Sequence, residues 1–440
     1  MLINKGCMSF RNYISENVFL PISDLIAGQN VARSFRFLKE TDGWSQEQVI
    51  DFQNKRLRML IRHAVESVPY YNDLFKSLNL SVDDIQTKND LRKLPIVDKS
   101  IMRREGGDRF VSNSYPVKKR VSHCSSGSTG EPFSYFTSKE SDGLNTAAKL
   151  STWYQAGYRM GDKYIKIANG ERQGVLKKLQ DRMNNCIFVP FYSISDDNLK
   201  AILRLVEEEK PSIIRSYPIP IYLLAQCRLD NPGFVFCPKH IMTTGSTLST
   251  AYRELIEKAF CCDVIDSYSC EGTPNTYETV SHDGYKVSDA FGIIEVLDEN
   301  DNVITDGVGR VISTDLWNFA QPFIRYDAHD LVEVRNGKIT RIMGRECDSL
   351  VCSGGIRYTV HNFSRFFLHE VSGVTAYQVV KKKDGSILFN LEVNNDFDDT
   401  VKNHIVKYWS EQLQKSVRLE IVPSIPLMKN NKRRVVVDEE

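Results

Sequence analysis

The spacing of apolar residues predicts a helical region in the first quarter of the chain. Between residues 46 and 68 apolar side chains recur every three or four positions, and Pro69 ends the pattern. Short helices are expected over residues 83–104, on either side of Leu94-Pro95-Ile96. We therefore predict a mainly helical arm over about residues 1–116.

Strand-like stretches alternate with helical ones through the middle of the chain. The expected helices are residues 198–209, 219–228 and 250–260, the last capped by Ser249 or Thr250. The expected strands are residues 164–168, 212–216, 240–243 and 264–265. Strands that alternate with helices favour an α/β layer structure.

From Gly284 onward the apolar period shifts to two, which favours antiparallel strands. They are expected at residues 293–297, 309–313, 331–334 and 338–342, with Asn336-Gly337 as a hairpin turn. After Gly344 we expect a hairpin of residues 374–381 and 387–393, a helix over 400–413 and a strand over 417–422. The expected fold class is α/β: a large N-terminal α/β domain with an antiparallel β subdomain, and a small C-terminal α+β domain.

Length and charge narrow the function. A chain of 440 residues is expected to hold two or three domains. Its formal net charge is +1 and its basic clusters are short, so we expect no nucleic-acid partner.

The ten cysteines are scattered and form no Cys-x-x-Cys pair, which predicts reduced thiols in a cytoplasmic protein. Cys237 and His240 have the spacing of half a zinc site. No second pair of ligands has suitable spacing, so we interpret Cys237 as a loop residue next to a strand.

The chain shows no membrane-spanning pattern. We expect no signal peptide, and no apolar run approaches the ~20 residues that a spanning helix needs. Residues 10–37 are nevertheless amphipathic, with Phe19, Ile22 and Leu25 among the apolar positions. Two interpretations stay open: an arm packed on its own domain, or a helix that lies on a membrane surface or a partner.

Five polar clusters follow one another along the chain. The first, Ser125-Ser126-Gly127-Ser128-Thr129-Gly130-Glu131-Pro132, combines glycines that let the backbone approach an anion with hydroxyls that can bind phosphate. It lacks the Gly-Lys-Ser/Thr of a Walker A loop. The other four span residues 266–272, 325–330, 344–348 and 426–434. Each alone is more simply a turn, a pair of exposed acids or a solvated tail, so the ordered set carries the argument.

This ordered set resembles the adenylate-forming superfamily of acyl-CoA synthetases and related ligases, and it is most similar to the phenylacetate–CoA ligase and CapK-like branch. The resemblance covers nearly the whole chain. It includes His63-Ala64, Val68-Pro69-Tyr70-Tyr71 and Leu94-Pro95-Ile96-Val97-Asp98-Lys99.

The resemblance implies a role for each matched residue. Glu271 would hold Mg²⁺, Asp330 would accept hydrogen bonds from both ribose hydroxyls, and Arg345 would contact the ribose or the α-phosphate. Asp348 would be the hinge of the last domain. Lys432, with Lys429 as its near rival, would stabilise the adenylation transition state, in which carboxylate attack on phosphorus builds negative charge. The remaining ATP-binding residues would be Ser125, Ser126, Gly127, Ser128, Thr129 and Gly130 at the β- and γ-phosphates, and Gly245, Ser246, Ser267 and Tyr268 around the adenine.

The sequence also departs from the family pattern. Asn431 stands where a Gly usually precedes the terminal lysine, His329 replaces the Gly before Asp330, and Ser246 stands where relatives often have Glu. The segment before Glu271 is contracted, which leaves the placing of Tyr268 open by one residue. These departures concern the acyl pocket and the rate more than the fold.

The resemblance implies an ATP- and carboxylate-binding domain over residues 1–347 and a small mobile domain over 348–440. The expected reaction is ATP- and Mg²⁺-dependent activation of a carboxylic acid as acyl-AMP, followed by transfer to coenzyme A, a carrier protein, or an amine or sugar. CapK-like relatives imply a role in surface polysaccharide biosynthesis. The expected location is cytoplasmic, with peripheral association at the inner face of the membrane as an option. Two alternatives stay open: an amide-forming ligase and a degenerate nucleotide-binding scaffold. The sequence does not name the acid, and its pocket is expected around residues 153–158, 215–222 and 243–247.

Overall fold

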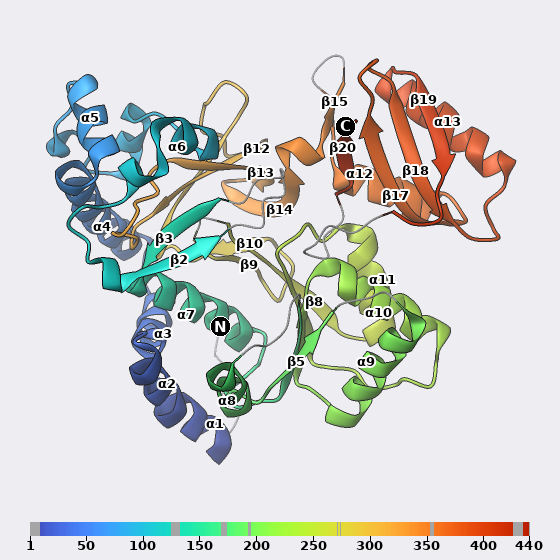
Figure 1. Ribbon diagram of the computed structural model, residues 1–440, viewed down its shortest axis with the longest axis horizontal. Coiled ribbons are helices and arrows are strands. Elements are labelled where there is room, and N and C mark those ends of the chain that lie inside the picture. Colours follow the sequence, from blue (N-terminus) through green and yellow to red (C-terminus); the bar gives the residue numbers. More distant parts are fainter. Residues whose placement is uncertain are drawn as a thin grey trace.

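The computed structural model describes residues 9–124, 133–168, 174–191, 195–270, 272, 274–352, 356–425 and 434–439. The chain begins with helices, drawn in blue in Figure 1. The longest of them, α4, carries a capping box formed by Ser45 and Gln48, and buries Leu57, Leu60 and Ile61 as the apolar spacing predicts. The helices of this arm are α1 (Phe10–Ile14), η1 (Ser15–Phe19), α2 (Leu20–Ala27), α3 (Val31–Thr41), α4 (Gln46–Ser67), α5 (Pro69–Ser77) and α6 (Lys99–Glu105).

A seven-stranded sheet forms the centre of the molecule, in the order β10-β9-β8-β7-β6-β4-β5. Its strands β4 to β8 are parallel, so their carboxyl ends meet at one edge, whereas β9 and β10 run antiparallel. The strands are β4 (Tyr164–Ala168), β5 (Cys186–Pro190), β6 (Ile213–Ser216), β7 (His240–Thr244), β8 (Asp263–Tyr268), β9 (Thr276–Glu278) and β10 (Tyr285–Val287).

Helices cover both faces of this sheet. On one face α9 (Asp196–Glu209), α10 (Pro218–Asp230) and α11 (Thr250–Phe260) pack on Ile165, Ile214 and Ile241. On the other face α7 (Lys139–Gln155) packs Trp153 against Met242 and Ile265. Figure 1 shows α7 and α9–α11 on opposite sides of the sheet, with α8 (Val175–Met183) near β5.

A second sheet contains β11 (Gly292–Leu297), β12 (Gly307–Asp315), β13 (Tyr326–Arg335) and β14 (Lys338–Arg345) in antiparallel order. The short strand β1 (Val97–Asp98) pairs with β13 in parallel and joins the helical arm to this sheet. A hairpin of β2 (Arg120–Cys124) and β3 (Ser134–Ser138) leads into α7, and the loop that joins its strands lies outside the described residues.

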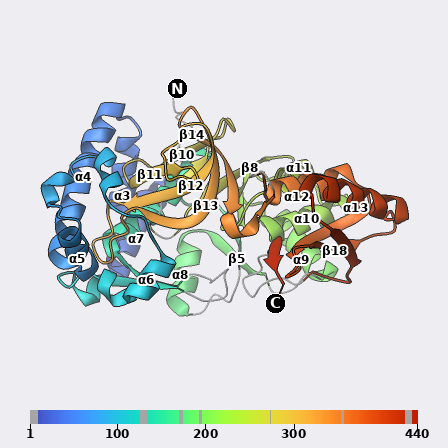
Figure 2. The same ribbon diagram turned by 90° about the horizontal axis from the view of Figure 1, so that it is seen from above.

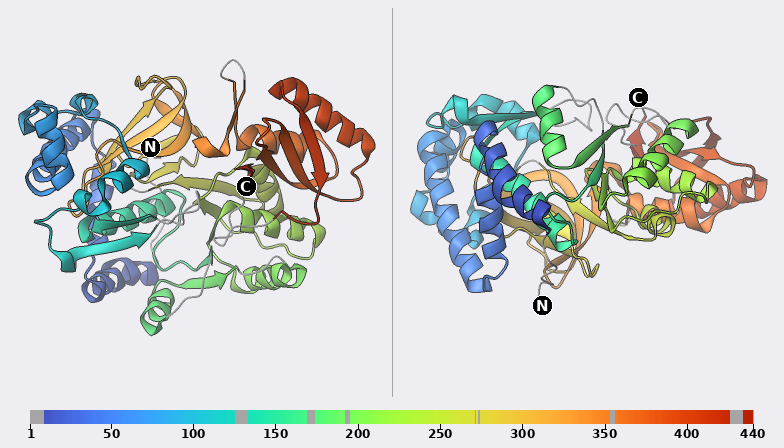
Figure 3. Two further views of the ribbon diagram at one scale, coloured as in Figure 1. Left: turned by 45° about the horizontal axis from the view of Figure 1, so that its top comes forward. Right: turned by 90° about the horizontal axis from the view of Figure 1, so that it is seen from below.

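The last part of the chain has a core of its own, in which Trp409, Phe363 and Phe389 pack together. Its four-stranded sheet has the order β19-β18-β17-β20. Figures 2 and 3 show this part at one end of the molecule and the N-terminal helices at the other. Its own core supports a separate unit, and the boundary at residues 347/348 stays a prediction. The elements are η6 (Glu346–Asp348), β15 (Leu350–Val351), β16 (Arg357–Tyr358), α12 (Val360–Arg365), η8 (Phe366–Glu370), β17 (Val374–Lys381), β18 (Ile387–Val393), α13 (Asp399–Leu413), β19 (Val417–Ile421) and β20 (Val436–Asp438).

Most of the expected elements are confirmed within one or two residues, and the Asn336-Gly337 hairpin joins β13 to β14. Several elements were not anticipated: the β2–β3 hairpin, β5, β9, β10, β20 and the long helix α7. The helix α7 buries small residues, among them Ser141, Gly143 and Ala147, so no stripe of large apolar side chains marks it in the sequence. Over the described residues, no helix is long and apolar enough to cross a bilayer.

Candidate functional site

The expected adenine segment lies at the carboxyl edge of the central sheet. Thr244 and Ser267 are register partners at the ends of β7 and β8. The Ser267 hydroxyl donates a 3.0 Å hydrogen bond to the carbonyl oxygen of Thr243. Gly245 follows with φ of +81°, a conformation that favours glycine, and turns the chain away from the strand. Ligands of parallel α/β sheets bind outside this edge.

Asp330, Tyr268 and Arg345 come together from three different strands. The Tyr268 hydroxyl donates a 2.8 Å hydrogen bond to Oδ2 of Asp330, and the Arg345 Nε lies 3.5 Å from Oδ1 of the same carboxylate. Asp330 and Arg345 are register partners on β13 and β14. Asp330 is only 6% exposed, so it is not the exposed strand-end acid that the sequence allowed as the simpler alternative.

Tyr268 is a hydrogen-bond donor across the physiological pH range. Burial raises its pKa well above the usual value, and the neighbouring Asp330 charge raises it further. Its ring packs in an apolar cluster with Tyr285, Val296 and Val311 between the two sheets. Tyr268 therefore fixes the position of the Asp330 carboxylate relative to the central sheet.

Gly344 brings the loop after β7 against the end of β14. It has φ of +97°, and a Cβ at this position would lie 2.9 Å from the Thr247 hydroxyl oxygen. Only a residue without a side chain permits this approach. The approach places Arg345, the next residue, beside the segment that holds Gly245 and Ser246.

The expected hinge residue lies beside the last strand of the chain. Asp348 is in η6, and its Oδ1 is 3.9 Å from the Nε of Arg434. Burial raises the Asp348 pKa, while the Arg434 and Arg345 charges oppose that change. The Arg434 carbonyl oxygen accepts a 3.2 Å hydrogen bond from Gln378 on β17, so the chain just after the lysine tail is fixed near the hinge.

Several known proteins are similar to this chain in sequence or in fold. No protein-family model matches the chain. The chain is 25% identical over 414 residues to protein CapK of Staphylococcus aureus, with 89% of each covered. It is 27% identical over 335 residues to the phenylacetate–coenzyme A ligase of Aromatoleum evansii, with 70% of this chain and 73% of the relative covered. The crystal structure of 2-hydroxyisobutyryl-CoA ligase in its postadenylation state superposes over 88% of both chains with a TM-score of 0.70 and 18% identity.

These similarities support the expected resemblance to the adenylate-forming superfamily, in its phenylacetate–CoA ligase and CapK-like branch. The expected family, α/β fold class and enzyme class, an AMP-forming ligase, are confirmed. The same 2-hydroxyisobutyryl-CoA ligase in its thioesterification state superposes with a TM-score of 0.56 over 90% of both chains. The chain therefore superposes better on the postadenylation structure of that ligase than on its thioesterification structure.

Several residues with expected roles lie outside the part of the chain that the structure describes. No position or contact is therefore assigned to them. They are Ser125, Ser126, Gly127, Ser128, Thr129, Gly130, Glu271, Lys429, Asn431 and Lys432.

The departure from the family pattern at His329 has a structural explanation. His329 has φ of +60°, so it keeps the left-handed conformation that a glycine adopts without strain. Its ring Nε2 is 3.1 Å from Oδ2 of Asp98 on β1, and its Nδ1 is 3.5 Å from Oε2 of Glu346 next to the hinge. The side chain therefore connects β1 to the segment that follows β14.

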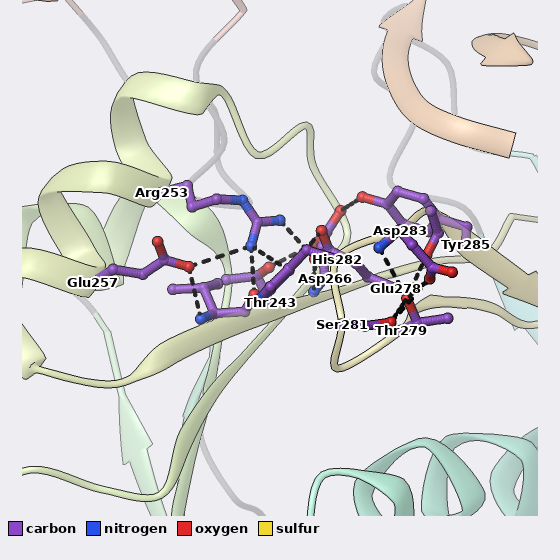
Figure 4. Close-up of polar contacts among 12 residues, drawn as sticks. Thr243, Arg253, Glu257, Asp266, Glu278, Thr279, Ser281, His282, Asp283 and Tyr285 are labelled. Atoms are coloured by element: carbon purple, nitrogen blue, oxygen red, sulfur yellow. Dashed lines mark hydrogen bonds and ion pairs between the residues drawn. The ribbon is translucent and has the colours of Figure 1, made fainter. Parts of the chain in front are cut away.

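A buried polar network behind β8 was not anticipated from the sequence (Figure 4). Asp266 accepts a 2.7 Å hydrogen bond from the Thr243 hydroxyl and a 3.0 Å hydrogen bond from the Tyr285 hydroxyl. Its amide donates to Glu278, which forms a 2.6 Å ion pair with Arg253 on α11. The network fixes the strand that carries Ser267 and Tyr268, and the only sequence signal for it was the position of Asp266 directly before Ser267.

The described residues contain no group of three or more His, Cys, Asp or Glu side chains that could hold a metal ion. Cys237 is exposed in a loop, and His240 begins β7.

Proposed function

We propose that the protein activates a carboxylic acid with ATP as an acyl-adenylate, releasing pyrophosphate, and then transfers the acyl group to the thiol of coenzyme A with release of AMP. The convergence of Tyr268, Asp330 and Arg345 beside Gly245 carries this proposal. It places a buried carboxylate and a guanidinium at the edge of a parallel sheet, where the superfamily is expected to bind the nucleotide.

Each described residue would act on the nucleotide by position and charge. The Asp330 carboxylate is held by Tyr268 and would accept hydrogen bonds from the ribose hydroxyls. Arg345 would offset negative charge on the ribose–phosphate side. Gly245 and Ser246 would line the adenine with backbone rather than with bulky side chains.

Magnesium is proposed as the partner of the ATP phosphates, with Glu271 as its expected ligand. The described residues offer no cluster that would hold the ion without the nucleotide. A bound Mg²⁺ would supply charge stabilisation at the phosphates. Lys432 would add an ammonium group at the α-phosphate during adenylation.

The small C-terminal domain is proposed to rotate about Asp348 between the two half-reactions. One ligase of similar fold has been solved in a postadenylation state and in a thioesterification state, and this chain superposes better on the first. This difference supports two arrangements of such a domain. We propose residues 1–347 and 348–440 as the two moving parts.

The decisive experiment is carboxylate-dependent exchange of pyrophosphate into ATP. A panel of aryl, fatty, hydroxy and dicarboxylic acids would be tested with and without coenzyme A, with and without Mg²⁺. We expect at least one acid to support exchange only with Mg²⁺, and coenzyme A to convert that acid to a thioester. If pyrophosphate exchange occurs but an acyl product forms only when an amine or a sugar is added, the amide-forming alternative would be favoured. Normal ATP binding without exchange for any acid would favour the scaffold.

We further propose that the protein acts in surface polysaccharide biosynthesis. We also propose that it is cytoplasmic and binds peripherally at the inner face of the membrane. Its support is the N-terminal arm, where Phe10, Leu25 and Ile26 are each more than two-thirds exposed. Co-sedimentation with anionic phospholipid vesicles should require these side chains. Equal co-sedimentation of the Leu25→Ser, Ile26→Ser variant would remove the arm as an anchor.

A further inference from the structure

Three positively charged side chains meet on the face of the central sheet that α7 covers. Lys166 on β4 and Arg215 on β6 are register partners on neighbouring strands, so they project from the same face side by side. The Arg215 guanidinium lies 6.0 Å from the centre of the Trp153 ring on α7. Lys149 is four residues before Trp153 and therefore on the same face of that helix.

Two of these cations, Lys149 and Arg215, are not neutralised by a described carboxylate. Within the part of the chain that the structure describes, neither Lys149 nor Arg215 has an ion-pair partner within 4.0 Å. The acid whose charge acts on Lys149 is Asp142, and its oxygens already contact His123 at 3.4 Å and Gln29 at 3.3 Å. All three cationic side chains are partly buried.

The surroundings of the cluster are apolar and aromatic. Trp153, Tyr158 and Met242 are buried around it, and the ring centre of Tyr164 lies 5.1 Å from that of Trp153. Burial lowers the pKa of Lys149 to about 8, and the positive charge of Arg215 lowers it further. Lys149 and Arg215 carry charges without an ion pair to any described residue, which are costly in such surroundings, and an anion that entered would offset that cost.

The cluster lies within reach of the proposed adenylation site. Arg215 is the register partner of Met242, which is two residues before Thr244 on β7. Two residues along a strand span about 7 Å and neighbouring strands are about 4.8 Å apart. A ligand whose reacting carboxylate lies at the carboxyl edge could therefore place a second group, about 6–8 Å deeper, beside Arg215.

We propose that Lys149, Lys166 and Arg215 form a binding site for a second carboxylate of the acid substrate, so that the protein activates one end of a dicarboxylic acid. The inference rests on the proposed acyl-activating function and gives it a substrate class. The planar guanidinium of Arg215 suits a carboxylate, with two parallel hydrogen bonds. The two lysines supply further charge, and Trp153 and Tyr158 form apolar walls for the carbon chain.

The test compares each dicarboxylic acid with its own monomethyl ester, which differs by one charge. Succinate, glutarate, adipate and their monomethyl esters would be titrated calorimetrically into the full-length protein with a non-hydrolysable ATP analogue. At least one diacid should bind about 10-fold or more tightly than its ester, the value expected for one charge-assisted contact. If no diacid binds more tightly than its ester, the proposal is overturned.

Two variants assign the preference to the cluster. Arg215→Met and Lys149→Met should each bring diacid and ester to similar affinity, while Arg215→Lys should retain part of the preference. Lys200→Met on α9, which covers the opposite face of the sheet, is the matched control and should keep the full preference. Folding of each variant is checked by circular dichroism, and Lys149→Met serves if Arg215→Met does not fold. An undiminished preference in a folded Arg215→Met or Lys149→Met protein would overturn the site.

Pyrophosphate exchange separates this proposal from the proposed function. Exchange supported by monocarboxylic acids alone would overturn the dicarboxylate site and leave acyl activation in place. Diacid binding that depends on Arg215, without exchange for any acid, would support the anion site and contradict acyl activation.

Discussion

The hydroxyl of Tyr268 donates a 2.8 Å hydrogen bond to Oδ2 of Asp330, across 62 positions of sequence and from one sheet to the other. Tyr268 ends β8 of the central sheet, whereas Asp330 lies within β13 of the second sheet. The contact holds Asp330, the acid expected to bind the ribose, against β8. That strand is expected to border the adenine. The two halves of the proposed nucleotide site are thus held together before ATP binds.

Removal of the Asp330 carboxylate should weaken ATP binding. A hydrogen bond to a charged acceptor is worth roughly 1.5–3 kcal/mol, so Asp330→Ala should lower ATP affinity by about 10-fold or more. Tyr268→Phe is the comparison, because it removes the donor and leaves the carboxylate, and we expect a smaller loss. Calorimetry on folded variants measures both. Unchanged ATP affinity in Asp330→Ala would remove Asp330 from the nucleotide site.

Loss of the Lys432 ammonium group should affect adenylation and spare acyl transfer. Negative charge builds at the α-phosphate only in the first half-reaction, and one such electrostatic contact is worth about 10²–10³ in rate. Lys432→Ala should therefore lose pyrophosphate exchange by that order and still consume a synthetic acyl-AMP. Lys429→Ala is the matched variant in the same tail. If Lys429→Ala loses exchange and Lys432→Ala does not, the roles of the two lysines are reversed.

A fixed backbone angle at Asp348 should have the opposite effect. Proline locks φ, so Asp348→Pro should restrict the proposed rotation, keep pyrophosphate release and lose transfer to coenzyme A. Asp348→Ala removes the same carboxylate and its contact with Arg434 without fixing φ, so it should retain both half-reactions. Thioester formation at the native rate by Asp348→Pro would show that no rotation occurs about this residue.

The buried network behind β8 should make stability depend on pH. Burial raises the pKa of Asp266 to about 6; its hydrogen bond from Thr243 opposes that shift and the Glu278 charge adds to it. The pKa of an aspartate in the unfolded chain is about 3.9. Between about pH 4 and 6 the folded protein therefore keeps a proton on Asp266 that the unfolded chain has released. The contribution of Asp266 to stability therefore falls as pH rises through this window and is constant above it.

Asp266→Asn removes this titration. The unfolding free energy of the variant relative to the native protein should rise by about 2 kcal/mol between pH 4 and pH 7, measured by denaturant unfolding. Asp230→Asn, an exposed substitution at the end of α10, controls for the loss of one carboxylate. A parallel pH dependence of the two variants would mean that Asp266 is ionised throughout.

Local pattern determined much of this protein from the sequence. The helical period of residues 46–68, the alternation through the middle and the Asn336-Gly337 turn each arise from short-range sterics and burial, so the corresponding elements form where they were expected. The alternation of these elements predicted the α/β fold, and the resemblance of the five ordered polar clusters to a known family predicted the superfamily.

The tertiary structure decided which side chains meet. Pairing between sheets brings Tyr268 to Asp330, the close approach at Gly344 brings Arg345 to Thr247, and strand register sets Lys166 beside Arg215. None of these contacts can be predicted from the sequence around either residue. Each contact joins residues far apart in the sequence, and the residues next to them in the chain indicate only whether a helix or a strand forms. The pattern of apolar residues fixes which face of an element is buried, and only the packing of whole elements determines what that face meets.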